Sequence, residues 1–296
     1  MSKTRIQAPE YEFNEEEKSL LKLTNWSPKT VDTLRNYLLA YDTIPDYKKV
    51  LRSMIKADQM YEPLTRSSLY PDILGDLKNI NMYRKAQRAQ VYMNKKDIIE
   101  TVDLGVGKRL VLTSKGHKIF YKDYPLSILR KKKWDGIWTV VMYDFPEKIK
   151  ARRQIFRHRL IRYGFGSPQI SILISPLPLG RPVRELVKGE KLKEYVWVQR
   201  SEGVLGLKDE EIAKVAWPLT ELNDLYTKLF EALPKIKKSI NKKTALKGWG
   251  KFYLAVDSKD PYLPFELLPS AWMGEKCRKE FSKFSIARII SSIFSF

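Results

Sequence analysis

The chain has 296 residues, with 55 lysines and arginines against 34 aspartates and glutamates, and a formal net charge of +21. Such a charge attracts polyanions and favours nucleic acid over an anionic membrane surface. Hydrophobic residues make up 43% of the sequence, which is enough for packed cores and excludes a disordered basic tail. The length indicates two or three domains.

Residues that form disulfides or bind zinc are scarce. Cys277 is the one cysteine, and only His117 and His158 accompany it. An intrachain disulfide framework and a structural zinc site are therefore excluded, and a reducing cytoplasm is indicated. We expect no secretory signal, because no basic segment followed by an apolar run opens the chain. The apolar run 286–296 is too short to span a bilayer, so we expect no membrane partner.

Residues 1–62 are predicted to form an N-terminal helical extension. Asn14 precedes three glutamates, which the helix dipole favours in a first turn. Ser27 and Pro28 open a second predicted helix, whose apolar face carries Val31, Leu34, Leu38 and Leu39.

Residues 63–128 show the order of a winged helix-turn-helix DNA-binding domain. Two helices with a short turn between them are followed by two strands around a glycine-containing tip at 105–107, and then by a closing helix. The predicted segments are Leu69–Leu77, Met82–Met93, Ile98–Leu104, Leu110–Thr113 and Ser114–Tyr121.

The second of these helices has the pattern of a recognition helix. An apolar stripe with spacings of four, three and four predicts its buried side: Met82, Ala86, Ala89 and Met93. At about 100° per residue, the opposite side carries Arg84, Gln87, Arg88 and Val91. Arginine can bind a guanine edge, glutamine an adenine edge, and valine a thymine methyl group. Asn81 is a candidate N-cap. The alternative is a solvated helix whose basic residues only keep the protein in solution.

The tip of the two-stranded wing carries two further cations. Lys108 and Arg109 follow the glycines 105 and 107 directly. Cations at this position are predicted to contact the phosphate backbone, which adds affinity but little sequence information.

Residues 134–207 form the next predicted domain. A β-branched run at Val140–Met142 predicts a core strand, which ends at Asp144 before Phe145-Pro146. A strongly basic helix is predicted from Ile149 to Tyr163, with Phe156, Leu160 and Tyr163 on its apolar side. Gly164 then occupies the usual position for ending a helix.

Residues 208–296 are predicted to form a helical C-terminal domain. Within it, seven lysines and no acid occur between Lys235 and Lys251. This run predicts an exposed loop or helix end.

Four motifs carry a resemblance to a known family: WDG at 134–136, YDFPE at 143–147, YGFGS at 163–167 and DPYLPFELLP at 260–269. Together with WPLTELNDLY at 217–226, they resemble the PaaX-type transcriptional repressors of phenylacetate degradation. The resemblance covers roughly residues 69–284, and the first sixty residues do not share it.

The resemblance implies an α+β protein whose middle domain is ferredoxin-like and similar to the CRISPR adaptation nuclease subunit. It implies a transcriptional repressor that binds a double-stranded DNA operator as a homodimer and is released by a small effector such as an acyl-CoA. No cofactor and no enzymatic activity are expected.

Asp144 leaves one alternative open. In the similar nuclease subunit, the matching aspartate holds a divalent metal across a dimer, so a metal-dependent nuclease using Mg²⁺ at Asp144 is the second hypothesis. A single carboxylate supplies only one of the several oxygen ligands that magnesium needs. The other interpretation of Asp144 is a structural cap near Arg152 or Arg153, and Glu147 likewise favours a first helical turn without any catalysis.

Overall fold

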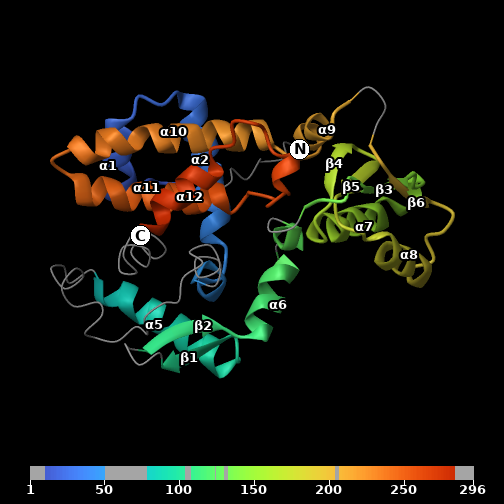
Figure 1. Cartoon of the computed structure of the whole chain (residues 1–296), viewed down its shortest axis with the longest axis horizontal. Helices are drawn as coiled ribbons and strands as arrows, with labels where there is room; N and C mark the ends of the chain where they lie inside the picture. The colour runs from blue at the N-terminus through green and yellow to red at the C-terminus, as the bar shows by residue number, and fades with distance from the viewer. Residues whose placement is uncertain are drawn as a thin grey trace, which may run out of the picture. The chain divides into compact units, whose positions relative to one another are not determined.

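The computed structural model describes residues 11–50, 79–103, 108–123, 125–129, 133–203 and 207–283. Helices predominate, and two small antiparallel sheets complete an α+β structure (Figure 1). The chain divides into two compact units: residues 1–116, 224–259 and 273–296 form the first, and residues 117–223 and 260–272 form the second. The predicted helix Leu69–Leu77 and the glycine tip 105–107 lie outside the described residues. The boundaries of the four predicted domains stay predictions.

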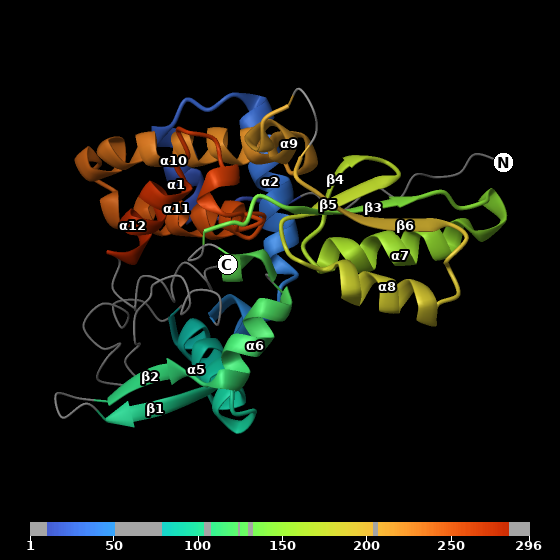
Figure 2. The same ribbon diagram turned by 45° about the vertical axis from the view of Figure 1, so that its right-hand side comes forward.

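Helices from both ends of the sequence pack together in the first unit. They are α1 (Glu15–Leu23), α2 (Pro28–Asp42), α10 (Leu219–Lys238), α11 (Lys242–Asp257) and α12 (Gly274–Ser282). Figures 1 and 2 show α10 and α11 running side by side, and α1 and α2 both contact α11. From Gly248 to Asp257 every residue of α11 is buried, so α11 is the central helix of this body.

The predicted starts of the first two helices are confirmed. The Asn14 side chain accepts a hydrogen bond from the Glu17 amide at 2.9 Å, and the Glu17 carboxylate accepts one from the Asn14 amide at 2.8 Å. This reciprocal capping box satisfies two amide donors that a helix start leaves free. Ser27 accepts a bond from the Thr30 amide at 3.4 Å and caps α2 in the same way.

The predicted exposed lysine run is wrong at its end. Most of the run forms the end of α10 and the start of α11, and Lys251 is only 3% exposed. Its ammonium lies 3.0 Å from the carboxylate of Glu17, which is fully buried. A buried cation needs such a partner, and the partner lies far away in the sequence, where a local charge pattern cannot reveal it.

A helix, a hairpin and a second helix also belong to the described first unit. They are α5 (Asn79–Lys95), β1 (Ile99–Asp103), β2 (Lys108–Leu112) and α6 (Ser114–Asp123), of which α6 continues into the second unit. The strands are antiparallel, with Thr101 opposite Leu110. Gly116 on α6 packs so closely on the Ile98 carbonyl that a Cβ atom there would overlap it. The predicted two-stranded hairpin and its closing helix are thereby confirmed.

The second unit is built on a four-stranded antiparallel sheet. In chain order it contains η1 (Pro125–Leu129), β3 (Trp138–Tyr143), η2 (Glu147–Ile149), α7 (Lys150–Arg162), β4 (Gly166–Gln169), β5 (Ile172–Ser175), α8 (Gly180–Gly189), β6 (Val196–Ser201), α9 (Asp209–Ala216) and η3 (Phe265–Leu267). The strand order across the sheet is β4-β5-β3-β6. Figure 2 shows α7 and α8 on the same face of the sheet.

Each face of this sheet carries its own core. Val141 and Leu173 pack with Phe156 and Leu160 of α7 beneath one face. On the other face, Trp138 and Ile174 pack with residues of α9 and η3. Because side chains alternate along a strand, β3 supplies both cores.

One predicted core position of α7 is wrong. Phe156 and Leu160 are fully buried, but Tyr163 is 41% exposed. The helix ends at Arg162, and Gly164 then adopts a φ of +88°, which turns the chain. Phe165, 2% exposed, takes the inward position instead.

Candidate nucleic-acid interface

The predicted reading face of α5 is exposed to solvent. Arg84, Gln87 and Arg88 are exposed, and Val91 is 59% exposed. On the other side of the helix, Ala89 is 5% and Met93 1% exposed. The helical period therefore places these two apolar residues in the core and the four polar and aliphatic candidates on one accessible stripe.

Among the described residues, no carboxylate neutralises the cations of this stripe. Neither Arg84 nor Arg88 forms an ion pair with any carboxylate of the described residues. The only bond of the Arg88 guanidinium in this part of the chain is from Nε to the Arg84 carbonyl at 3.2 Å. Most guanidinium donors therefore remain available for a ligand, and five donors in a planar fork suit phosphate or a guanine edge.

Asn81 is not the N-cap that its sequence context predicts. Helix α5 begins at Asn79, so Asn81 lies inside its first turn. Asn79 and Ile80, where a turn is predicted, already have helical backbone. The position of Asn81 near the helix start is unchanged, but its proposed capping role is lost.

The wing cations lie at the start of a strand. Lys108 and Arg109 open β2, and their backbones pair with Asp103 and Val102 of β1. Their side chains lie outside what the structure describes. The prediction that they contact phosphate stays a prediction.

Asp144 follows β3, as predicted, but it caps nothing. Its amide donates to the Tyr195 carbonyl at 2.9 Å, and its side chain is exposed. Among the described residues, its carboxylate bonds neither Arg152 nor Arg153. Arg152 instead donates to the Glu190 carbonyl, and Arg153 lies 3.8 Å from Glu147. The expected cap at Asp144 is therefore wrong.

Glu147 occupies the first turn of η2, as its position before the basic helix predicts. Its carboxylate lies 3.0 Å from Lys150 and 3.8 Å from Arg153. The hydrogen bond and the charge of Lys150 hold the pKa of Glu147 below its ordinary value. Lys150 is exposed and Arg153 is partly buried, and these two contacts account for Glu147 without a metal.

Within the described residues, no three histidine, cysteine, aspartate or glutamate side chains come together as metal ligands. Asp144 alone does not fit the oxygen shell of Mg²⁺. The described helices also include none with the length and apolar character of a membrane span.

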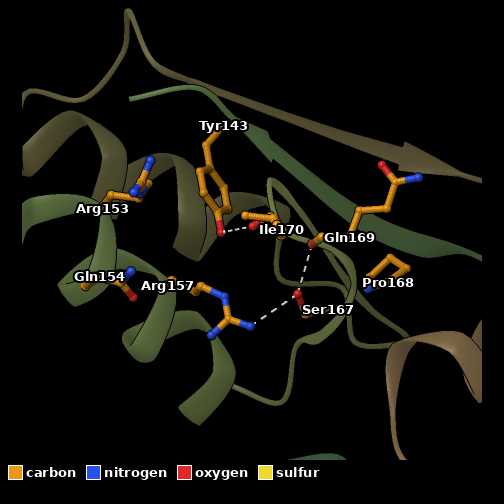
Figure 3. Close-up of a pocket in the computed structure, with 8 residues that line it drawn as sticks. All are labelled: Tyr143, Arg153, Gln154, Arg157, Ser167, Pro168, Gln169 and Ile170. Carbon is orange, nitrogen blue, oxygen red and sulfur yellow. Dashed lines mark hydrogen bonds between the residues drawn. The ribbon is translucent and has the colours of Figure 1, made fainter. Parts of the chain in front are cut away.

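Sequence reasoning missed one further feature of the basic helix. Arg153 and Arg157 of α7 line a cavity beside Tyr143 (Figure 3). The sequence places both arginines on α7, but the facing wall comes from strand β4 and Ile170, and only the folded sheet brings it there.

Comparisons with known proteins agree with the observed second unit and with the C-terminal helices. Residues 131–213 match the family model described as the PaaX protein central Cas2-like domain, and residues 217–288 match the PaaX-like protein C-terminal domain. Helix α5 and the β1–β2 hairpin precede both matched segments.

Two individual proteins are also similar. The transcriptional repressor PaaX of Escherichia coli is 25% identical, over 66% of this chain and 66% of its own length, just under two thirds of the repressor. A solved structure of an uncharacterised protein from Mycobacterium tuberculosis has a TM-score of 0.46 and 17% identity, over 82% of this chain and 95% of that one. Because the two domain models match in chain order and together cover more than half of the 296 residues, the chain belongs to the PaaX family.

Proposed function

We propose that this protein is a sequence-specific DNA-binding transcriptional regulator that acts as a repressor in the cytoplasm, without enzymatic activity. The observation that carries the proposal is the exposed stripe of α5, where a glutamine, a valine and two arginines that pair with no described carboxylate lie on one helix face. The net charge of +21 and the similarity to a transcriptional repressor support it.

In this proposal, α5 enters the major groove as the second helix of a winged helix-turn-helix. Arg84, Gln87 and Arg88 read base edges, Val91 contacts a thymine methyl group, and Lys108 and Arg109 of the wing bind the backbone. The antiparallel β1–β2 hairpin directly after α5, followed by α6, supports this assignment.

The second unit is proposed to be ferredoxin-like. Its order of elements, β3-α7-β4-β5-α8-β6, and its strand order β4-β5-β3-β6 support that assignment. By similarity to the repressor family, we further propose that the protein works as a homodimer and responds to a small effector such as an acyl-CoA. No observation on the described residues favours the alternative of a magnesium-dependent nuclease.

The test is a gel-shift series on full-length protein, with an operator selected from random duplexes by the wild type. Arg84→Ala and Arg88→Ala should each reduce discrimination between operator and random DNA by about 1–3 kcal/mol, because a base contact is lost. Lys108→Ala should weaken binding to both DNAs about equally and lower the salt dependence by about one unit.

The matched control is Arg162→Ala, which removes one exposed cation of α7 and should leave discrimination unchanged. If the Arg84 and Arg88 variants discriminate as well as wild type does, α5 is not the reader. If the wild type selects no sequence at all, the proposed function is wrong.

A further inference from the structure

A cavity in the second unit remains without a role in DNA reading. Its volume is about 410 Å³, and it lies between α7, the end of β3, and strand β4 with Ile170 after it (Figure 3). This volume falls within the range of small-molecule sites, about 300–1,000 Å³.

One wall of the cavity is cationic. Arg153 and Arg157 stand one helical turn apart on α7 and therefore lie on the same face. No acidic side chain of the described residues lines the cavity. Glu147 lies 3.8 Å from Arg153 and is shared with Lys150, which is 3.0 Å away. Arg157 forms no ion pair with any described carboxylate. The wall thus carries two positive charges with little compensation.

In the described part of the chain, the guanidinium of Arg157 forms a long hydrogen bond to Ser167 and also interacts with the Tyr143 hydroxyl. Its Nη2 donates to Ser167 Oγ at 3.4 Å, while the Ser167 hydroxyl donates to the Gln169 carbonyl at 2.9 Å. The Tyr143 hydroxyl donates to the Ile170 carbonyl at 2.6 Å, and burial raises its pKa against the opposing effect of Arg157 and Arg153. Figure 3 shows the Arg157 guanidinium pointing toward Ser167 of β4 and the Tyr143 hydroxyl pointing toward Ile170. Tyr143 therefore stays neutral. The charges of Arg153 and Arg157 then make the cavity favour a negatively charged ligand.

The facing wall is largely apolar. Pro168 and Ile170 lie opposite α7, and the Tyr143 ring closes the side. A single oxyanion needs much less room than this cavity offers, so the remaining space suits a flat apolar group. Two guanidinium groups together match a group with two negative charges, which a phosphate monoester supplies near neutral pH.

We propose that this cavity is a binding site for a small organic phosphate, with its phosphoryl group on Arg153 and Arg157 and its apolar part against Pro168 and Ile170. The proposal goes beyond the DNA-binding function and does not depend on it, because the site shares no residue with α5.

The test is titration calorimetry on full-length protein with three probes: phenyl phosphate, inorganic phosphate and phenol. Phenyl phosphate should bind most tightly, inorganic phosphate at least fivefold more weakly, and phenol undetectably. Affinity for phenyl phosphate should fall as pH is lowered from 7.5 to 5, because its phosphate group takes up a second proton with a pKa of about 6.

Variants on α7 separate a site from general charge attraction. Arg157→Gln and Arg153→Gln should each weaken phenyl phosphate binding at least tenfold, with unchanged circular dichroism. Arg162→Gln removes the same charge from the same helix outside the cavity and should change affinity less than twofold. Having two independent cavity variants keeps the test valid if one of them unfolds.

Three results would overturn the proposal. The first is no binding of phenyl phosphate at millimolar concentration. The second is equal weakening by Arg162→Gln, which would indicate charge attraction alone. The third is displacement of phenyl phosphate by a random duplex, which would make the cavity a contact for the nucleic-acid backbone.

Discussion

The residues that carry the family resemblance are mostly core residues of the second unit. Trp134 and Trp217 pack in the core on one face of the sheet. Gly166, in the YGFGS motif, lies under the Trp217 ring, which a Cβ atom would approach to 2.6 Å. Leu263 and Leu267 of the DPYLPFELLP motif lie in the same core. These motifs therefore identify a fold and leave the DNA contacts to other residues.

Asp144 gives a prediction that separates the repressor from the nuclease. Its exposed carboxylate has no partner among the described side chains, so Asp144→Asn should change unfolding free energy by less than about 0.5 kcal/mol. Operator affinity should also be unchanged. Chemical denaturation and gel shifts measure both quantities.

The contradicting result for Asp144 is enzymatic. Wild type and Asp144→Asn are incubated with linear duplex, single strand and RNA, with magnesium or with chelator. We expect no cleavage in any reaction. Magnesium-dependent cleavage by wild type that disappears in the variant would establish the nuclease.

The reading face of α5 could be predicted from the sequence, and the buried lysine could not. The helical period alone places Ala89 and Met93 on the opposite side of α5 from Arg84 and Arg88, and this period is a local property of the sequence. Lys251 donates at 2.9 Å to the Tyr11 hydroxyl, 240 residues earlier. The cavity beside Arg157 was missed for the same reason, because its second wall comes from another element.

At the scale of elements, α1 and α11 approach each other closely at Gly248. A Cβ atom there would overlap the Glu16 carbonyl of α1. Gly248→Ala should therefore destabilise the protein by about 1–3 kcal/mol, although alanine is the better helix former. The measurement is thermal unfolding followed by circular dichroism.

Gly189→Ala is the matched control for Gly248→Ala. Gly189 ends α8, and a Cβ atom there meets nothing within 4 Å. That change should be neutral or slightly stabilising. Equal melting of the two variants would show that the close approach of α1 and α11 is not present.

The Glu17–Lys251 pair provides a second prediction for the same two helices. Lys251→Met leaves a fully buried carboxylate without its cation, which should cost about 3–5 kcal/mol. Burial and the charge of Glu17 raise the pKa of Tyr11, so its hydroxyl stays protonated and donates to Glu17 at 2.7 Å, which does not replace the lost positive charge. Denaturant unfolding measures the loss, and Glu17→Gln in the same chain should restore part of it.

A neighbouring pair serves as control for Lys251. Lys247 lies 3.1 Å from Glu16 across the same helices, but both side chains are 20–23% exposed. Lys247→Met should therefore cost less than about 1 kcal/mol. If the two variants lose the same stability, burial is not what makes the Lys251 pair important.

At the scale of the whole molecule, the homodimer remains a prediction. Operators of helix-turn-helix proteins are two-fold symmetric, so a dimer should address half-sites about one helical turn, or a multiple of it, apart. Light scattering at micromolar concentration should give twice the chain mass of 34.7 kDa. A monomer both free and on DNA would contradict the proposed assembly.

The packing of α1 on α11 also has a consequence for synthesis of the protein on the ribosome. Glu17 leaves the exit tunnel when Lys251 has not yet been translated, so the nascent helix cannot bury its carboxylate at that stage. The apolar side of α2, with Leu34 and Leu38, must then wait for α11 as well. A ribosome stalled before Lys251 should therefore hold a chain whose first helices are protease-sensitive and available to chaperones, and protection should appear only once α11 has emerged.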